Sequence, residues 1–281
     1  MSICSNVLML ALFAAVPAGA QTPAAPPATA AAQQSDPDVR VDPLQPDFTL
    51  AALPTTLRVP NHKLAFRVTH RFSRSFGAGD IGDLLADFFG LDSGAQIGLE
   101  LRYGLRRGTQ IGIHRTNDRT IQLFAQQSIL QERDGRPFGL DGIVTFEGRD
   151  NLHQQHQSAL GAILSKRLLN HAVVYAEPLV VFNTNPDEGD VADENNTFMA
   201  GLGARVRVLP SLYVTGEITP RLAGYDPKVN QMTFALETRV GGHTFQVNVG
   251  NGFGTTFGQI ARGGETYDSW FLGFNISRKF F

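Results

Sequence analysis

The sequence predicts an all-β protein, an antiparallel transmembrane β-barrel of twelve strands. Three observations support this: alternation of apolar and polar residues along most of the chain, a cleavable leader before it, and connections of alternating length. The clearest strand reads Q-I-G-L-E-L-R-Y-G-L over 96–105. Side chains on a strand alternate between two faces, so one face here is apolar and the other polar. A barrel in lipid requires this pattern, because only alternate residues meet the bilayer.

Residues 1–20 have the pattern of a secretory signal peptide. An apolar core over 7–16 precedes the small-residue cleavage site Ala18-Gly19-Ala20. The core is too short to cross a membrane, which takes ~20 apolar residues. No Lys or Arg precedes the core, which departs from the usual pattern. The only cysteine, Cys4, leaves with this leader, so we expect no disulfide and no zinc–cysteine site in the mature chain.

Residues 21–59 are predicted to be a Pro/Ala-rich tether in the periplasm. The segment begins T-P-A-A-P-P-A-T-A-A-A-Q-Q, a composition that cannot bury a core and favours an extended or disordered chain. Patterned sequence begins at Pro60-Asn61, and we therefore predict that the barrel occupies 60–281.

The first five strands each carry apolar residues at one parity and polar residues at the other. They are expected over 63–72, 96–105, 110–114, 120–129 and 140–149. Their apolar faces are, in order, Leu64, Phe66, Val68 and Phe72; Ile97, Leu99, Leu101 and Tyr103; Ile111 and Ile113; Ile121, Leu123, Ala125 and Ile129; Leu140, Val144 and Phe146.

The next two strands, over 157–167 and 172–182, are apolar on both faces, so their phase stays open. The last five return to clear alternation over 198–208, 212–221, 232–240, 244–249 and 270–280. Their apolar faces include, in order, Leu202 and Val206; Leu212, Val214 and Ile218; Phe234 and Leu236; Phe245 and Val247; Trp270, Leu272, Phe274 and Ile276.

The connections favour a bacterial outer-membrane barrel, which has short periplasmic turns and long outer loops. Counting from a periplasmic N-terminus, the short turns fall at 106–108, 169–170, 210–211 and 241–242, and the long loops at 73–93, 183–196 and 250–267. The brief connection at 117–118 and the longer turn at 131–137 depart from this rule. An even number of strands returns the C-terminus to the periplasm.

Composition narrows the partners. The formal net charge is −2, so the composition gives no reason to expect a nucleic-acid partner, which would require a basic surface. The expected partners are the lipid bilayer of the outer membrane and, through the C-terminal strand, the barrel-assembly machinery. A soluble periplasmic β-sandwich is the rival fold, but it would leave half of the apolar strand faces without a partner.

The inward faces carry a network of charge. Its expected members are Arg67, Arg71, Glu100, Arg102, Glu147, Arg149, Arg205, Arg207, Glu217, Arg221, Glu237 and Arg239. In three places a glutamate stands two positions before an arginine on the same face. One interpretation is structural, in which opposite charges pair across the lumen and fill it. The other is an anion-preferring pore, because arginines outnumber glutamates eight to four in this set.

The first outer loop contains a short helical pattern. Asp80 fits an N-cap and Gly90 a helix end, and Asp83, Leu84, Asp87 and Phe88 lie between them. The helix would either fold into the mouth as a plug, with its aspartates meeting lumen arginines, or lie on the membrane surface, or pack on the barrel rim.

No catalytic, cofactor or metal site is expected. The acidic loop over 187–194 lacks the EF-hand spacing, and His153 and His156 lack the metalloprotease glutamate. A surface lipase would need a Ser, a His and an acidic or amide partner, and no Gly-x-Ser-x-Gly motif is present. We therefore expect that the protein is not an enzyme and keep a surface lipase as a remote alternative.

Several segments resemble one known family. They are E-N-N-T-F-M-A-G-L-G-A-R over 194–205, G-G-H-T-F-Q over 241–246, G-F-N-I-S-R over 273–278, and F-R-V-T-H-R-F over 66–72 followed by F-G-L-D over 89–92. The region from about 60 to 281 is similar to the β-barrel family catalogued as domain of unknown function 5777 (DUF5777). The resemblance implies a barrel and carries no activity. One departure is that Phe281 follows Phe280, which offsets the terminal aromatic by one.

Two functions of different classes remain. The first is a narrow or gated channel for small polar or anionic solutes, occluded by the 73–93 loop. The second is a closed structural or docking barrel that serves as a sleeve or anchor for a periplasmic partner. Deleting 76–90 separates them, because a plugged channel should gain conductance and a filled barrel should not.

Overall fold

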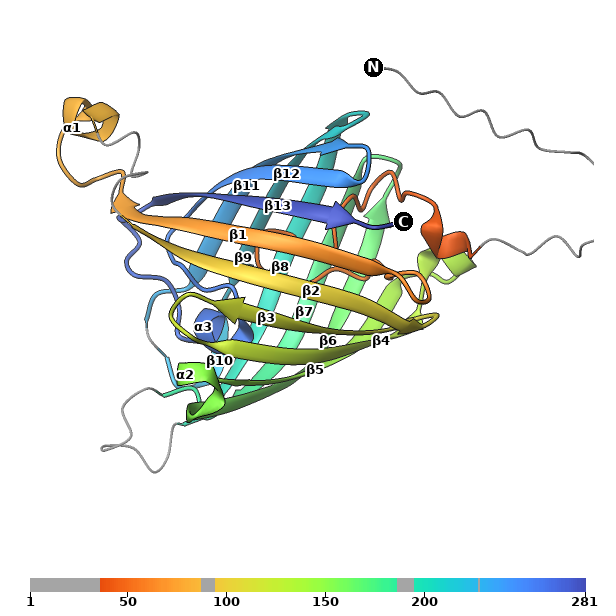
Figure 1. Ribbon diagram of the computed structural model, residues 1–281, viewed down its shortest axis with the longest axis horizontal. Coiled ribbons are helices and arrows are strands. Elements are labelled where there is room, and N and C mark those ends of the chain that lie inside the picture. The colour runs from red at the N-terminus through yellow and green to blue at the C-terminus, as the bar shows by residue number, and fades with distance from the viewer. Residues whose placement is uncertain (1–35, 87–93, 186–194, 227) are drawn as a thin grey trace, which may run out of the picture. The chain divides into compact units, whose positions relative to one another are not determined.

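The computed structural model describes residues 36–86, 94–185, 195–226 and 228–281, which form a closed antiparallel β-barrel of twelve strands (Figure 1). This confirms the predicted fold class. The ring closes because β1 (Leu64–Ser75) pairs with β2 (Ala95–Arg106) on one side and with the last strand, β13 (Phe271–Lys279), on the other. Arg67 thus lies between Glu100 and Ser277. Closure of the ring removes the two free edges that an open sheet would expose to lipid.

The other strands follow the predicted order. They are β3 (Thr109–Thr116), β4 (Ile121–Leu130), β5 (Gly139–Gly148), β6 (Gln154–Leu168), β7 (Ala172–Phe182), β8 (Thr197–Leu209), β9 (Leu212–Thr219), β10 (Arg221–Gly224), β11 (Gln231–Val240) and β12 (His243–Gly250). Strand β10 continues β9 beyond Pro220, and both pair with β8, so together they count as one barrel strand.

The helices are short. They are α1 (Ile81–Ala86), α2 (Arg149–Leu152), α3 (Phe257–Ala261) and the 3-10 turns η1 (Pro37–Val39) and η3 (Glu132–Asp134). Across the described residues, no helix is both long enough and apolar enough to cross a membrane.

The two ends of the barrel differ. At the short-turn end, defined by the turns after β2, β6, β8 and β11, lie η3, η1 and the C-terminus. At the long-loop end, defined by the connections after β1, β7 and β12, lie α1, α2 and α3 (Figure 1). The arrangement agrees with the predicted alternation of short and long connections.

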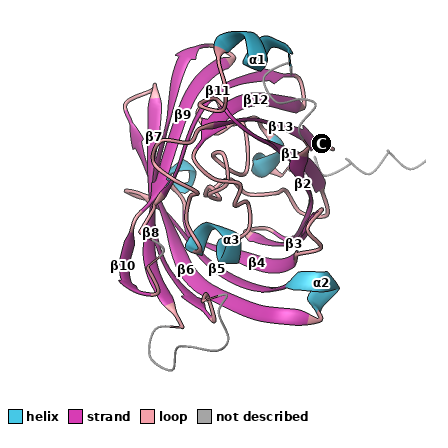
Figure 2. Cartoon of the chain, turned by 90° about the vertical axis from the view of Figure 1, so that its left-hand side faces the viewer, coloured by secondary structure: helices cyan, strands magenta, loops and turns pink. Residues whose placement is uncertain are grey.

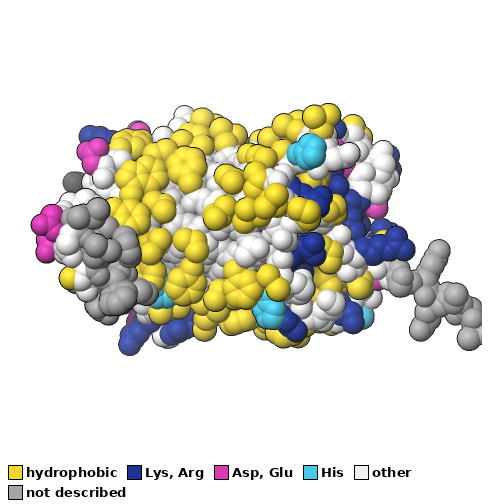
Figure 3. Space-filling view, turned by 90° about the horizontal axis from the view of Figure 1, so that it is seen from above, with side chains coloured by type: hydrophobic (Ala, Val, Ile, Leu, Met, Phe, Trp, Pro, Cys, Tyr) yellow, Lys and Arg dark blue, Asp and Glu magenta, His cyan; other side chains and the backbone are white. Residues whose placement is uncertain are grey.

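The outer face is apolar along the middle of the strands. Leu101, Leu123, Leu160, Val214 and Phe234 are each more than two-fifths exposed. Figure 3 shows one side of this surface, on which hydrophobic side chains cover the middle and Lys and Arg gather toward the short-turn end. This is the surface that a bilayer would cover.

The two strands of open phase have a clear orientation. In β6 and β7, Ile163, Val173, Leu179 and Val181 point inward and are buried, whereas Leu160 points outward. These strands are apolar on both faces because the inner face packs against other parts of the same chain, not against water. The sequence pattern was therefore a sign of a filled lumen.

The tether prediction is wrong for residues 36–59. The structure places them inside the barrel, where Leu44, Phe48, Leu50, Leu53 and Leu57 are buried. Only residues 21–35 have the Pro/Ala-rich composition on which the prediction rests. Residues 36–59 contain enough large apolar side chains to be buried. The expected signal peptide over 1–20 and residues 21–35 lie outside the described residues.

Candidate functional site: the occupied lumen

Two parts of the chain lie inside the ring of strands (Figure 2), and they enter it from opposite ends (Figure 1). The first, which we call the plug segment, comprises residues 36–59 and enters from the short-turn end. The second, which we call the inner loop, comprises residues 251–262 with α3 and enters from the long-loop end. Leu50 and Leu53 of the plug segment and Phe257 and Ile260 of the inner loop belong to one buried apolar cluster with inward side chains of β5 to β8. One wall of the lumen is therefore a hydrophobic core.

The tip of the plug segment is a narrow hairpin. The amide of Leu50 donates to the carbonyl of Leu53 at 2.7 Å, and the amide of Thr55 donates to the carbonyl of Phe48 at 2.8 Å. Thr49 and Pro54 form the bridge between its two arms. The turn between the arms presents its remaining backbone groups to the charged wall of the lumen.

Glu217 on β9 binds one side of this turn. Its carboxylate accepts hydrogen bonds from the amides of Ala51 at 3.0 Å, Ala52 at 3.0 Å and Leu53 at 3.1 Å. Three successive amides that converge on one carboxylate form an anion-binding nest. Hydrogen bonds to an ionised acceptor are about twice as strong as neutral ones. Glu217 therefore holds the tip through three successive backbone amides.

Arginines bind the opposite side of the turn. The carbonyl of Ala51 accepts hydrogen bonds from Arg67, from Arg71 at 3.3 Å and from the amide of Asn275 at 3.0 Å. Arg205 on β8 donates to the carbonyl of Thr49 at 2.6 Å. The charged lumen side chains thus bind the backbone of the plug segment, not only one another.

Neutral side chains bind the arms of the hairpin. Gln246 donates to the carbonyl of Leu50 at 2.8 Å, and Gln126 to that of Thr55 at 2.8 Å. The hydroxyl groups of Thr56 and Ser165 lie 2.6 Å apart. Irregular backbone at membrane depth is tolerated only where its polar groups find partners inside the protein, and the polar lumen wall supplies them.

Two ion-pair groups complete the polar wall. Glu100 accepts from Arg102 and lies 3.8 Å from both Arg67 and His114. Arg205 and Glu237 pair at 3.0 Å, and both are fully buried. Glu100 and Arg102 pair within one strand, whereas Glu237 and Arg205 pair between strands, and Arg205 also binds the plug segment.

Glu147 on β5 binds the inner loop. Its carboxylate accepts from the amide of Gly258 at 3.1 Å and the hydroxyl of Thr256 at 3.0 Å, and so holds the start of α3. Thr256 also caps α3 in a capping box with Gln259. Arg149 lies in the exposed α2 turn and donates to Gln155. The strand ends at Gly148, so the chain turns away before Arg149 can face inward.

The members of the predicted charge network differ in how deeply they are buried. Eight members are buried: Arg67, Arg71, Glu100, Arg102, Glu147, Arg205, Glu217 and Glu237. Three lie partly exposed toward the barrel ends, namely Arg207, Arg221 and Arg239. Arg221 reaches the inner loop, where it donates to the carbonyls of Ile260 and Ala261.

The first outer loop, over 73–93, is described only up to Ala86. Helix α1 projects at the long-loop end (Figure 1). Asp80 and Asp83 are exposed and bind each other's backbone amides at 2.9 and 3.2 Å. The side chain of Leu84 and all of Asp87 and Phe88 lie outside the described residues. The lumen position expected of this loop is occupied by the plug segment and the inner loop.

Two buried acids lie outside the predicted charge network. Glu177 on β7 is completely buried, and neither carboxylate oxygen has a hydrogen-bond partner among the described residues. Asp141 on β5 accepts from Gln126 at 2.7 Å and Gln131 at 3.1 Å. The signal for Glu177 was a lone charge in an otherwise apolar strand, and fixing the phase of β7 would have placed it inward.

The base of the plug segment is held at the short-turn end. Arg58 pairs with Asp134 of η3 at 2.5 Å and lies 3.7 Å from Asp38. Partial burial tends to raise the pKa of Asp134, but the hydrogen bond and charge of Arg58 outweigh it and hold that pKa below its usual value. Asp42 accepts from Arg167 on β6. The base is therefore fastened by ion pairs and the tip by backbone hydrogen bonds.

Metal ligands do not converge in the part of the chain that the structure describes. The ring nitrogens of His153 and His156 contact the carbonyls of Asp150 and Leu152, at 2.7 and 2.8 Å. Of the acidic loop over 187–194, all residues lie outside the described ranges.

Comparison with known proteins identifies the fold. The sequence model of a family described as membrane bound beta barrel domain (DUF5777) matches residues 47–280, which confirms the resemblance. No curated protein matches the sequence. The NanC porin is similar at a TM-score of 0.52 and 10% identity, over 76% of this chain and 98% of that one.

Two other solved structures are similar at lower scores. The KdgM porin in complex with disordered oligogalacturonate has a TM-score of 0.50 and 8% identity, over 78% of this chain and 99% of that one. Outer membrane phospholipase A from Escherichia coli has a TM-score of 0.43 and 10% identity, over 80% and 91%. At identities of 8–10%, the similarity shows a shared fold only.

Proposed function

The chain belongs to the family of membrane bound β-barrel domains (DUF5777), and we propose that it is an outer-membrane channel that its own plug segment holds closed. The observation that carries the proposal is the way the lumen charges are used. Arg67, Arg71, Arg205 and Glu217 bind the backbone of a terminal segment that the barrel wall does not need for closure. A barrel that served only as a solid support would fill its lumen with paired side chains of its own strands.

The plug segment is suited to movement. It joins the barrel wall covalently only at its C-terminal side, where Pro60 leads into β1. Its tip is held by hydrogen bonds to backbone groups, and water would replace these when the segment withdraws. Bacterial barrels keep their short turns in the periplasm, so we propose that the plug segment enters from the periplasmic side.

A weak preference for anions follows from the same contacts. Withdrawal of the tip would release Arg67 and Arg71 from the carbonyl of Ala51 and Glu217 from its three amides. Arg102 and Arg205 would keep their glutamate partners. Withdrawal thus frees two arginines and one glutamate from the plug segment, and charged groups that line a pore set its selectivity.

A reversible cross-link tests the proposal. The hydroxyls of Thr56 and Ser165 lie 2.6 Å apart and both residues are buried, so the double variant Thr56→Cys/Ser165→Cys places two thiols close to disulfide distance. The mature chain is expected to have no other cysteine. Oxidation would join the plug segment to β6, and reduction would free it.

We expect planar-bilayer recordings to show opening events in the reduced double variant, with a reversal potential that favours anions. Oxidation should abolish them and reductant should restore them, while Thr56→Cys and Ser165→Cys alone should not respond. Conductance that persists after complete oxidation would contradict gating by the plug segment. An inserted barrel that conducts in neither redox state would contradict a channel and support the closed docking barrel. The many hydrogen bonds between the lumen wall and the plug segment favour this second function.

A further inference from the structure

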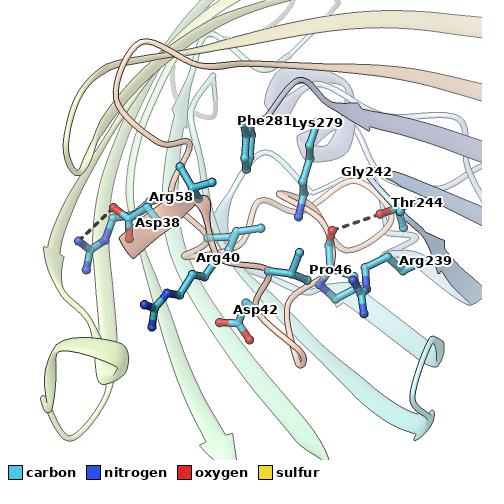
Figure 4. A pocket seen from close by; sticks show the side chains of 14 residues that line it. Asp38, Arg40, Asp42, Pro46, Arg58, Arg239, Gly242, Thr244, Lys279 and Phe281 are labelled. Atoms are coloured by element: carbon cyan, nitrogen blue, oxygen red, sulfur yellow. Dashed lines mark hydrogen bonds and ion pairs between the residues drawn. The ribbon is translucent and has the colours of Figure 1, made fainter. Parts of the chain in front are cut away.

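A cavity of about 220 Å³ lies at the short-turn end, between the plug segment and the barrel wall (Figure 4). The plug segment contributes Asp42 and Leu57, among others, and the wall contributes Arg239, Lys279 and Phe281. Both surfaces are needed to enclose it. The cavity therefore exists only while the plug segment is in place.

Two cationic side chains reach this cavity without a direct ion pair to any described residue. Neither Lys279 nor Arg239 forms a side-chain hydrogen bond or ion pair with any residue in the described ranges, and Nε of Arg239 is buried. Figure 4 shows both side chains pointing toward the region of Pro46. The ammonium group of Lys279 lies 5.1 Å from the ring centre of Phe48. Partly buried cations without a counter-charge are costly, so an anion would stabilise this arrangement.

The acidic side chains of the cavity are already engaged. Asp42 accepts from Arg167 and from the amide of Leu44 at 2.9 Å. Asp38 lies 3.7 Å from Arg58 and 3.6 Å from Arg107. Neither carboxylate lies within ion-pair distance of Lys279 or Arg239, although Asp42 and the neighbouring Asp47 attract Lys279 at longer range. The lining carries four cationic side chains, those of Arg40, Arg58, Arg239 and Lys279, against these two carboxylates, so the cavity has an excess of positive charge.

We propose that this cavity binds a small organic carboxylate, and that the bound anion holds the plug segment closed. Its volume lies below the usual range of ligand sites, ~300 Å³ and above, which suits a compact molecule. Lys279 and Arg239 supply the charge, and Leu57 and Phe281 supply an apolar surface beside them. Because the ligand contacts both the plug segment and the wall, it stabilises the closed state by mass action. This proposal does not require that the barrel conducts.

Isothermal titration of the refolded 21–281 protein in detergent with succinate tests the site, with succinamide as the uncharged counterpart. We expect succinate to bind and succinamide not to bind. Lys279→Met and Arg239→Gln should each weaken succinate binding by about tenfold or more, as expected for loss of one charge-assisted hydrogen bond. Arg278→Gln is the matched control, because Arg278 neighbours Lys279 in sequence but is exposed and contacts His243.

A second readout follows the plug segment itself. Saturating succinate should slow the reaction of a cysteine placed at the buried residue Thr49 with a membrane-impermeant thiol reagent, and Arg239→Gln should remove this effect. No binding by the wild-type protein, or equal binding of succinate and succinamide, would overturn the proposal. So would unchanged affinity in both Lys279→Met and Arg239→Gln, provided that each variant shows the β-sheet circular dichroism spectrum of the parent.

Discussion

Replacing Glu217 with glutamine is expected to loosen the tip of the plug segment. The carboxylate accepts three backbone amides of residues 51–53 at 3.0 to 3.1 Å inside a buried lumen. Glutamine has one acceptor oxygen, and its amide nitrogen would face donors. A hydrogen bond to a charged group contributes about 1.5–3 kcal/mol. Because one oxygen remains as an acceptor, we expect a loss of about 3 kcal/mol from the closed state, or roughly a hundredfold in the closing equilibrium.

The assay uses a single reporter cysteine at Thr49. This side chain is 1% exposed and its hydroxyl has no partner among the described residues, so Thr49→Cys removes no hydrogen bond. Where closing is faster than labelling, the labelling rate reports the open fraction. Glu217→Gln in the Thr49→Cys background should therefore react with an impermeant maleimide roughly a hundred times faster than Thr49→Cys alone.

The control is Glu265→Gln, which removes one negative charge at an exposed position of the long-loop end. It should leave the labelling rate unchanged. An unchanged rate in the Glu217→Gln variant would refute the assignment of Glu217 as the holder of the tip. A lower thermal unfolding midpoint with unchanged labelling would show that Glu217 stabilises the barrel wall instead.

Three shorter predictions address the lumen and the lipid face. Gly203→Ala should speed labelling of the Thr49→Cys reporter, because the new Cβ would overlap Cδ1 of Leu50 and overpacking costs about 1–3 kcal/mol. Gly142→Ala is the control and should leave the labelling rate unchanged, because its Cβ would meet only a side-chain methyl group at 3.8 Å. Glu177→Met should raise the thermal unfolding midpoint, because it replaces a buried carboxylate that has no hydrogen-bond partner among the described residues. A lower midpoint would show that the carboxylate has a partner in solution. Leu101→Arg should cost about 2–4 kcal/mol in denaturant unfolding from lipid vesicles, since Leu101 is 42% exposed on the apolar outer face, and a cost near zero would place β2 outside the bilayer.

The strand order was predictable because one face of each strand is expected to meet lipid and the other the lumen. In β2, Leu99 and Leu101 point outward, and Glu100 and Arg102 are buried within, as alternation indicates. The same logic failed to give a phase in β6 and β7. There the inner face packs against Leu50, Leu53 and α3, so both faces had to be apolar.

The inward direction of most charges was also predictable, but their partners were not. A register between neighbouring strands brings Glu100 beside Arg67. Nothing local indicates that Glu217 would bind the amides of a turn 164 to 166 positions earlier in the chain. Such a contact depends on the path of the plug segment through the lumen, and that path has no periodic signal.

The sequence by itself determined the closed barrel, its strand order and its apolar outer face, because each follows from residue parity within one strand. Only the tertiary structure decided what occupies the lumen. Residues 36–59 have neither the alternation of a strand nor the spacing of a helix, and their burial depends on partners supplied by Glu217, Arg67 and Arg205 from separate strands. A segment whose tip is held largely by side chains distant in sequence has no local pattern that marks it as folded.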